Sequence, residues 1–230
     1  MAELLLIRHG QASFSAEDYD QLSPVGERQS VLLGEWLAEC GPVPDLVAIG
    51  PRVRHRDTAE HCLRAAGLAP PSLLLQGLDE VDHQQLLARL RPDLAAPGAL
   101  RAAMKQSDDP HRAFQRLFVE ALDRWSSGAH DAEYSCSWAT FRANVLNALQ
   151  TLAEHPAQTI WAFTSGGPIA VITSALLDTP PSQTFRLSWP LVNTGMTRVR
   201  LGSRTSTLVT YNAWPHLERT GAETGLITLR

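Results

Sequence analysis

Lysine is almost absent from this chain: Lys105 is the only lysine among 20 Lys and Arg residues, against 24 Asp and Glu residues in a total of 230. The formal net charge is −4, so we expect no broad positive surface of the kind that attracts nucleic acids or anionic membranes. Neither partner is therefore expected. Any affinity for phosphate must come from a few arginines placed locally.

Cysteine is also scarce, with Cys40, Cys62 and Cys136 far apart and in no Cys-x-x-Cys or Cys/His spacing. This pattern predicts neither a disulfide framework nor a zinc site. The N-terminal apolar run, 4–7, is too short for a signal peptide, and no run has membrane-spanning length. No Gly-x-x-x-x-Gly-Lys loop occurs. We expect a cytoplasmic protein without metal or other cofactor.

Short apolar segments alternate with longer amphipathic ones along most of the chain. The expected strands are 3–7, 46–49, 72–75, 159–163, 191–201 and 206–211, and the expected helices are 24–39, 53–66, 138–152 and 168–177. Ser23-Pro24 provides an N-cap and a first-turn proline for the first helix. The alternation predicts an α/β fold, a three-layer α/β/α sandwich with a central, mostly parallel sheet.

The segment from about 81 to 134 breaks this alternation. It has helical character interrupted by Pro, Gly and Asp, and its basic and acidic side chains balance. A chain of this length has room for one domain with a substantial core but not for two full ones. We therefore interpret 1–230 as a single domain with a helical cap insertion at about 81–134.

The most informative residues follow the first expected strand. Arg8, His9 and Gly10 lie where that strand reaches the carboxyl edge of the sheet, which is where α/β proteins build their sites. A neutral imidazole can attack a phosphoryl group, and a neighbouring guanidinium can offset the negative charge that would repel it. Without further motifs, the same three residues could equally be a structural charge pair at a strand end.

Further motifs occur in a fixed order after this one. They are Leu22 to Gly26 with Gln29, Pro51 to Arg54 with Thr58-Ala59, Leu78-Asp79-Glu80, Thr164 to Pro168, and Tyr211-Asn212 with His216-Leu217. Together with Arg8-His9-Gly10 they resemble the histidine phosphatase superfamily, which includes phosphoglycerate mutases. The resemblance extends over nearly the whole chain.

The resemblance implies that His9 is the nucleophile and forms a phosphohistidine. Arg8 and Arg54 match the arginines that hold the phosphoryl oxygens. Arg52 and Arg56 flank Arg54, and only the count back from Thr58 selects the middle residue.

Glu80 matches the acid that protonates the leaving group and then deprotonates the attacking water. Asp79, Asp82 and His83 crowd the same stretch, and an ordinary acid at a helix N-terminus is the alternative interpretation of Glu80.

Several positions depart from the family pattern. Ser165 stands where the family has a second histidine that contacts the phosphoryl group, and Gly50 and Asp57 replace a usual Ser and Gln. A serine donates a neutral hydrogen bond in place of a charged one, so we expect lowered but not abolished activity.

Two smaller departures follow Arg8-His9-Gly10: Ser15 replaces an Asn, and Gln11 replaces the commoner Glu. With Ser165 and the backbone of Gly166 they form the expected substrate-binding set.

These observations predict a metal-independent phosphomonoesterase that acts on a small phosphorylated metabolite through a phosphohistidine. A phosphoglycerate-type mutase is the alternative within the same chemistry. A non-catalytic phosphate-binding or regulatory protein with a degraded site is the alternative outside it, and Ser165 is the reason to consider it. The sequence leaves the substrate and the oligomeric state open.

Overall fold

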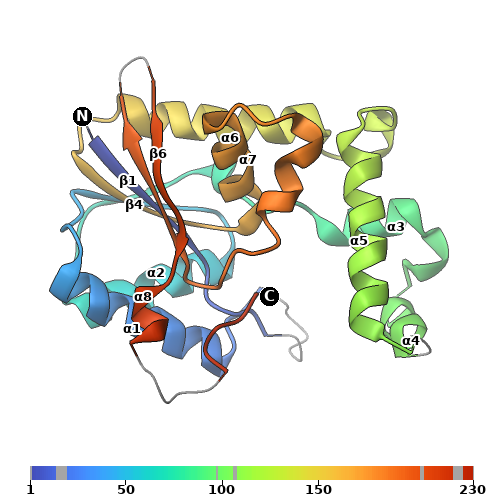
Figure 1. Cartoon of the computed structure of the whole chain (residues 1–230), viewed down its shortest axis with the longest axis horizontal. Helices are drawn as coiled ribbons and strands as arrows, with labels where there is room; N and C mark the ends of the chain where they lie inside the picture. Colours follow the sequence, from blue (N-terminus) through green and yellow to red (C-terminus); the bar gives the residue numbers. More distant parts are fainter. Residues whose placement is uncertain are drawn as a thin grey trace. The chain divides into compact units, whose positions relative to one another are not determined.

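The computed structural model describes residues 2–13, 20–96, 98–105, 108–202, 205–219 and 225–229. The chain divides into two compact units, one made of Met1–Glu80 with Asn144–Arg230 and the other of Val81–Ala143. The first unit contains the sheet (Figure 1). Every residue that the sequence singled out for catalysis also falls within its ranges.

A six-stranded sheet forms the centre of the first unit. Its strands are β1 (Ala2–Arg8), β2 (Leu46–Ile49), β3 (Ser72–Leu74), β4 (Thr159–Thr164), β5 (Met196–Leu201) and β6 (Thr207–Ala213). They run in the order β3-β2-β4-β1-β5-β6. The first four in this order pair in parallel, and β5 and β6 add antiparallel pairs at one edge. A mostly parallel sheet is thus confirmed.

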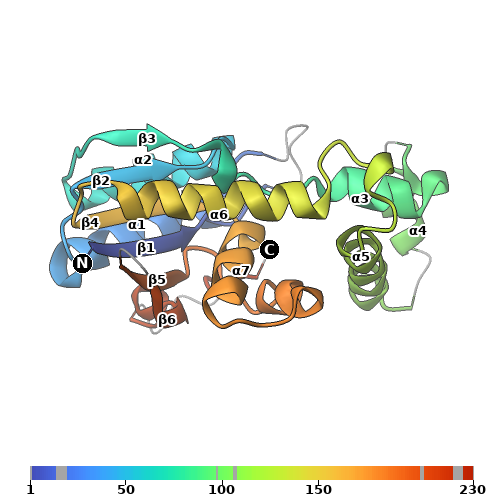
Figure 2. The ribbon, with the colours of Figure 1, turned by 90° about the horizontal axis from the view of Figure 1, so that it is seen from above.

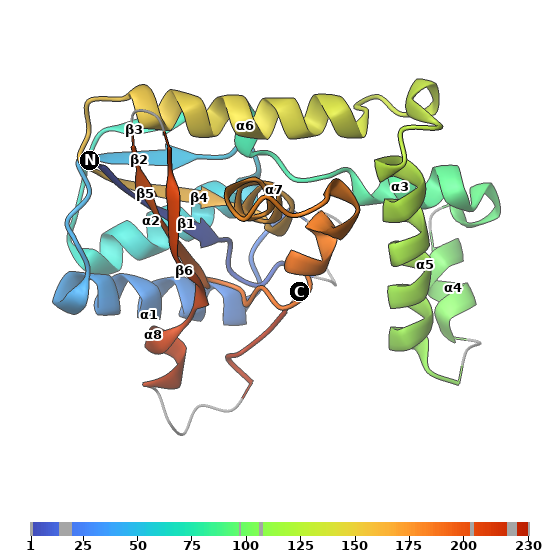
Figure 3. The same cartoon turned by 45° about the horizontal axis from the view of Figure 1, so that its top comes forward.

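Helices cover both faces of this sheet (Figures 2 and 3). The helices α1 (Pro24–Cys40) and α2 (Val53–Ala66) pack on one face, and α7 (Gly166–Leu176) and α6 (Trp138–Glu154), from residue 144 on, cover the other. The short α8 (Pro215–Glu218) contacts α1. The 3-10 turns Gln76–Leu78 and Pro181–Leu187 complete the unit. This arrangement confirms the predicted three-layer sandwich.

The hydrophobic core between the sheet and the α1/α2 layer explains why the strand sequences are continuous apolar runs. Ile7 of β1 and Phe163 of β4 are buried against Leu33 of α1 and Cys62 of α2. Parallel strands covered on both faces bury nearly every side chain. Burial of one large apolar side chain stabilises the folded state by about 1.5–3 kcal/mol.

The second unit, Val81–Ala143, is helical. It contains α3 (His83–Leu90), α4 (Ala99–Lys105) and α5 (Pro110–Ser126), with 3-10 turns at Pro92–Leu94 and Asp131–Glu133. Trp125 packs against Trp138 and Phe141, with ring centroids 5.5 Å apart in each pair, and its indole N–H donates to the Cys136 carbonyl over 2.9 Å. The role of this unit as a cap stays a prediction.

The expected strand 191–201 is wrong in its first half, because β5 begins only at Met196. Thr194 has a φ of +60°, and its N–H donates to the carbonyls of Arg8 and His9. Leu191 and Val192 are buried, so the apolar pattern is real, but it belongs to a loop folded against the end of β1.

Within the described ranges, no helix has both the length and the apolar character needed to cross a membrane.

Candidate active site

The carboxyl ends of three parallel strands bring the predicted residues to one edge of the sheet. His9 follows β1, Gly50 follows β2 and Ser165 follows β4. The ladder continues past the strand ends, because the His9 N–H donates to the Thr164 carbonyl over 2.9 Å and the Gly50 N–H to the Phe163 carbonyl over 3.0 Å. Residues distant in the sequence therefore become neighbours here.

The His9 imidazole is held in one tautomer. Its Nδ1 lies 2.7 Å from the carbonyl oxygen of Gly10, and a carbonyl only accepts, so Nδ1 carries the proton and Nε2 keeps its lone pair. The side chain is 5% exposed. Burial, followed by the positive charges of Arg54 and Arg8, holds the His9 pKa well below 6.5. The ring is thus neutral near pH 7, as a nucleophile must be.

The loop 191–195 fixes the backbone of His9 from the other side. The Asn193 amide donates to the His9 carbonyl over 3.0 Å. The Thr194 hydroxyl donates to the Asn193 carbonyl and so accepts from Nε2 of His216, 2.8 Å away. Burial lowers the His216 pKa to about 3, so this histidine is neutral and bonds to the loop through Thr194. Asn193 and Thr194 were not predicted, because nothing in their own sequence distinguishes them.

Arg8 and Arg54 both lie close enough to His9 to lower its pKa. Arg8 Nη1 donates to the carbonyls of Leu191 and Leu229. Its Nε would lie 3.9 Å from a Cβ built on Gly166, which places the guanidinium beside the start of α7.

Arg54 is only 6% exposed, and its Nη1 donates to Asp20 Oδ1 over 2.8 Å. The other oxygen of Asp20 accepts from the Val53 N–H over 2.8 Å, so this carboxylate caps α2 as well. Sequence reasoning missed Asp20.

The two arginines beside Arg54 have other partners. Arg52 Nε lies 2.5 Å from Asp79 Oδ1. Arg56 is more than half exposed, with Asp57 and Glu60 as its ion-pair partners. Among the three, Arg54 is the one buried near the His9 ring, which is the register that the count from Thr58 selects.

Glu80 lies at the N-terminus of α7. Its Oε1 accepts from the Gly167 N–H over 3.2 Å. The neighbouring acids are engaged elsewhere, since Asp79 bonds to Arg52 and Asp82 caps α3 by accepting from the Gln85 N–H. Glu80 is therefore the acid of this stretch that the structure places beside the glycine turn after β4.

Ser165 has an unexpected partner. Its Oγ lies 2.6 Å from Nε2 of His55, and both side chains are completely buried. The centroid of the His55 ring is 5.8 Å from that of His9. His55 could not be selected from the sequence, because it stands next to Arg54 in a helix and its partner is 110 residues away.

The remaining predicted substrate-binding residues differ in their placement. Gly166 is the first residue of α7. The Gln11 side-chain oxygen accepts from the Ser23 hydroxyl over 2.8 Å, and the Gln11 backbone N–H donates to the Gln29 side chain over 2.9 Å. In this structure Gln11 therefore ties the loop after β1 to the start of α1. Ser15 lies outside the described residues.

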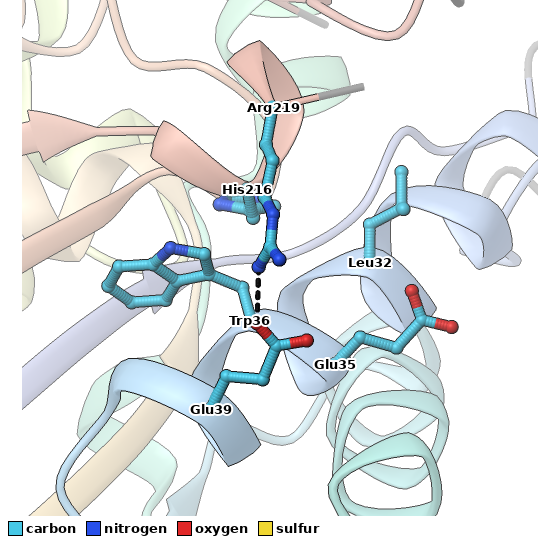
Figure 4. Close-up of a pocket in the computed structure, with 6 residues that line it drawn as sticks. All are labelled: Leu32, Glu35, Trp36, Glu39, His216 and Arg219. Atoms are coloured by element: carbon cyan, nitrogen blue, oxygen red, sulfur yellow. Dashed lines mark hydrogen bonds and ion pairs between the residues drawn. The ribbon is translucent and has the colours of Figure 1, made fainter.

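A surface pocket of about 270 Å³ lies between α1 and α8 (Figure 4). Leu32, Glu35, Trp36, Glu39, His216 and Arg219 line it, and an ion pair joins Arg219 to Glu39. None of the predicted catalytic residues lines this pocket. In the part of the chain that the structure describes, no three His, Cys, Asp or Glu side chains gather in a way that could hold a metal ion.

Comparison with known proteins agrees with this arrangement. The family model of the histidine phosphatase superfamily (branch 1) matches residues 4–213. No match was found among curated proteins.

Solved structures share the fold at low identity. A phosphoglycerate mutase from Bacillus anthracis is 13% identical, with a TM-score of 0.67 and 96% of each chain covered. A phosphoserine phosphatase variant from Entamoeba histolytica is 20% identical, with a TM-score of 0.62 and 94% of this chain and 100% of the other covered. An alpha-ribazole phosphatase from Shigella flexneri is 18% identical, with a TM-score of 0.62 and 92% and 96% covered. Since the family model spans almost its entire length, this chain belongs to branch 1 of the histidine phosphatase superfamily.

Proposed function

We propose that the protein is a phosphomonoesterase that hydrolyses a small phosphorylated metabolite through a phosphohistidine at His9. The observation that carries this proposal is the His9 Nδ1–H···O=C bond to Gly10, which leaves the Nε2 lone pair for attack beside two guanidinium groups. Two of the structural relatives act, by their names, on phosphoserine and alpha-ribazole phosphate. A small phosphate monoester is the substrate class that we carry over to this chain.

In the first step, His9 Nε2 forms a bond to phosphorus while the bond from phosphorus to the leaving oxygen breaks. Arg8 and Arg54 bind the phosphoryl oxygens and stabilise the charge that they carry in the transition state. Glu80, in its protonated form, gives its proton to the departing alkoxide. The products of this step are an alcohol and phosphohistidine.

In the second step, a water molecule attacks the phosphorus of the phosphohistidine. The Glu80 carboxylate accepts the proton of the water, and the bond from phosphorus to Nε2 breaks. His9 regains its lone pair and inorganic phosphate leaves. No other proton donor or acceptor is needed to balance the cycle.

The test is turnover of an aryl phosphate and a panel of small phosphate monoesters, with and without a chelator. We expect release of inorganic phosphate that the chelator does not change, and loss of at least 10³-fold in His9→Ala, since removal of a nucleophile leaves only the binding contributions. Transfer of phosphate between hydroxyls instead of its release would favour a mutase. Wild-type turnover in His9→Ala would refute the assignment, and a protein that binds phosphate without turnover would be the non-catalytic alternative.

A further inference from the structure

The His55–Ser165 pair is buried next to the nucleophile, yet the proposed mechanism does not use it. His55 comes from the first turn of α2, and Ser165 stands between the end of β4 and the start of α7. The Ser165 hydroxyl makes no capping bond to α7; it bonds to His55 Nε2 over 2.6 Å. A buried polar pair of this kind has to be satisfied and is costly to break.

Two departures from the family pattern lie on opposite sides of this one imidazole. Position 50 is glycine, and a Cβ built there would lie 2.3 Å from Nδ1 of His55 and 2.6 Å from the Leu78 carbonyl oxygen, so a side chain at this position would force its neighbours to shift. Position 165 is serine, whose short side chain ends at Nε2 of the same ring. The ring of His55 therefore lies between the backbone of Gly50 and the hydroxyl of Ser165.

Ser165 lies among the groups that bind the phosphoryl oxygens. The residue after it, Gly166, faces Arg8, and the Gly167 N–H bonds to Glu80. The residue before it, Thr164, accepts from the backbone N–H of His9. The residues on either side of Ser165 thus lie next to the predicted nucleophile, arginine and acid.

We propose that His55 is a positioning residue of the phosphoryl site, holding the Ser165 hydroxyl so that it donates a hydrogen bond to a phosphoryl oxygen. A phosphoryl oxygen only accepts, so the hydroxyl proton must point towards it when it binds. This requires the neutral His55 ring to carry its proton on Nε2, which then donates to the Ser165 oxygen, and to keep the Nδ1 lone pair towards the Gly50 backbone. Two side chains, His55 of α2 and Ser165 just after β4, together supply the donor that the family pattern places in a single histidine. This inference rests on the proposed function.

A double-mutant cycle tests this coupling. The variants are His55→Ala, Ser165→Ala and the double variant, with His61→Ala, a half-buried histidine of the same helix, as the matched control. We measure the dissociation constants of vanadate and inorganic phosphate, kcat/KM with an aryl phosphate, and the thermal unfolding temperature. Each single variant should lower kcat/KM by about 10- to 100-fold, and the double variant should lose no more than either single one.

Relocation of the ring provides a rescue that a merely structural role would not give. Ser165→His alone should be impaired because His55 occupies the space that the new ring needs. The double variant His55→Ala with Ser165→His should exceed His55→Ala alone in kcat/KM by at least tenfold. If His55→Ala does not fold, the same measurements are made on His55→Gln and on the double variant His55→Ala with Ser165→His.

The ring can also be observed directly. The NMR signal of the His55 Cε1–H should shift when vanadate binds, while that of His61 should not. Additive effects of the two alanine substitutions, wild-type vanadate affinity in His55→Ala, or an unshifted His55 signal would each overturn the proposal. A wild-type protein that neither binds phosphate nor hydrolyses any ester would refute the proposed function and this inference together. An active wild-type protein in which His55→Ala behaves like the control His61→Ala would refute only the role of His55.

Discussion

Arg8 and Arg54 have different hydrogen-bond partners in the described part of the structure. Arg8 donates to main-chain carbonyls, whereas Arg54 is bonded to the carboxylate of Asp20. An incoming phosphate must share Arg54 with that carboxylate and is repelled by its charge. We therefore expect Asp20 to oppose the proposed phosphate binding, while its other oxygen bonds to the first N–H of α2.

We expect Asp20→Asn to bind inorganic phosphate and vanadate a few-fold more tightly, because the amide is neutral and leaves the Arg54 charge to the ligand. Dissociation constants from titration calorimetry would measure the change. Asp45→Asn is the matched control, since Asp45 also accepts from backbone N–H groups but at the start of β4, the opposite end of the sheet. Weaker binding in Asp20→Asn would instead make Asp20 a residue that positions Arg54 for phosphate.

At Glu80, general acid catalysis predicts an effect that depends on the leaving group. Glu80→Gln keeps an oxygen for the Gly167 N–H but has no acidic proton. Turnover should fall by about 10²- to 10⁴-fold for alkyl phosphates and much less for an aryl phosphate whose phenoxide leaves without protonation. Rates for a series of leaving groups would measure this. An equal loss across the series would assign the proton donor to another residue.

At the scale of elements, the loop after β1 is held between the N-terminal parts of α1 and α2. The Gly10 N–H donates to the Thr58 hydroxyl of α2 over 3.0 Å, and that hydroxyl donates to the Arg54 carbonyl. On the other side, a Cβ on Gly26 of α1 would lie 2.2 Å from the Gln11 carbonyl oxygen. The position of His9 therefore depends on how closely α1 approaches this loop.

Gly26→Ala should reduce both stability and turnover, because the new methyl group displaces the backbone that carries His9. We expect a loss of about 1–3 kcal/mol in the free energy of unfolding, the usual cost of overpacking, together with a lowered kcat. Ala38→Gly, at an exposed position of the same helix, should cost about 1 kcal/mol through helix propensity alone and leave kcat unchanged. Urea unfolding and steady-state kinetics would separate the two. A Gly26→Ala enzyme with full kcat would show that the loop position does not depend on α1.

For the whole molecule, three buried histidines link stability to pH. Burial holds the pKa of His9, His55 and His216 below 6.5, in the last case to about 3. Each is neutral in the folded protein where the unfolded chain takes up a proton. The unfolded state thus binds more protons below pH 6.5, and the free energy of unfolding falls as the pH falls from there towards the folded-state pKa values.

We expect each of these histidines to remove up to about 1.4 kcal/mol of stability per pH unit below 6.5. Urea unfolding at pH 7.5 and 5.5 would measure the loss, and His216→Gln should reduce it by the share of one histidine. Equal stability at the two pH values would mean that the rings are not held neutral by the fold.

Local sequence determined the elements whose signals are complete within a few residues. The strand 46–49 and the helix 53–66 have the predicted bounds, and Ser23 caps α1 by accepting from the Gly26 N–H. Apolar runs, caps and helix-ending glycines act over one or two turns, so a sequence displays them directly. Arg8, His9, Arg54 and Glu80 could be selected because each belongs to a short motif in a fixed order.

Only the tertiary structure decided what surrounds His9. Asp20 meets Arg54 across 34 residues and His55 meets Ser165 across 110, and neither pair has a local signal. In the sequence, Gly50 and Ser165 are two separate departures from a family pattern. They meet at one ring because parallel β2 and β4 end at the same edge, where α2 places the His55 imidazole between the Gly50 backbone and the Ser165 hydroxyl. Side-chain packing at such an edge is set by the assembly of the sheet and its helices, which no short stretch of sequence contains.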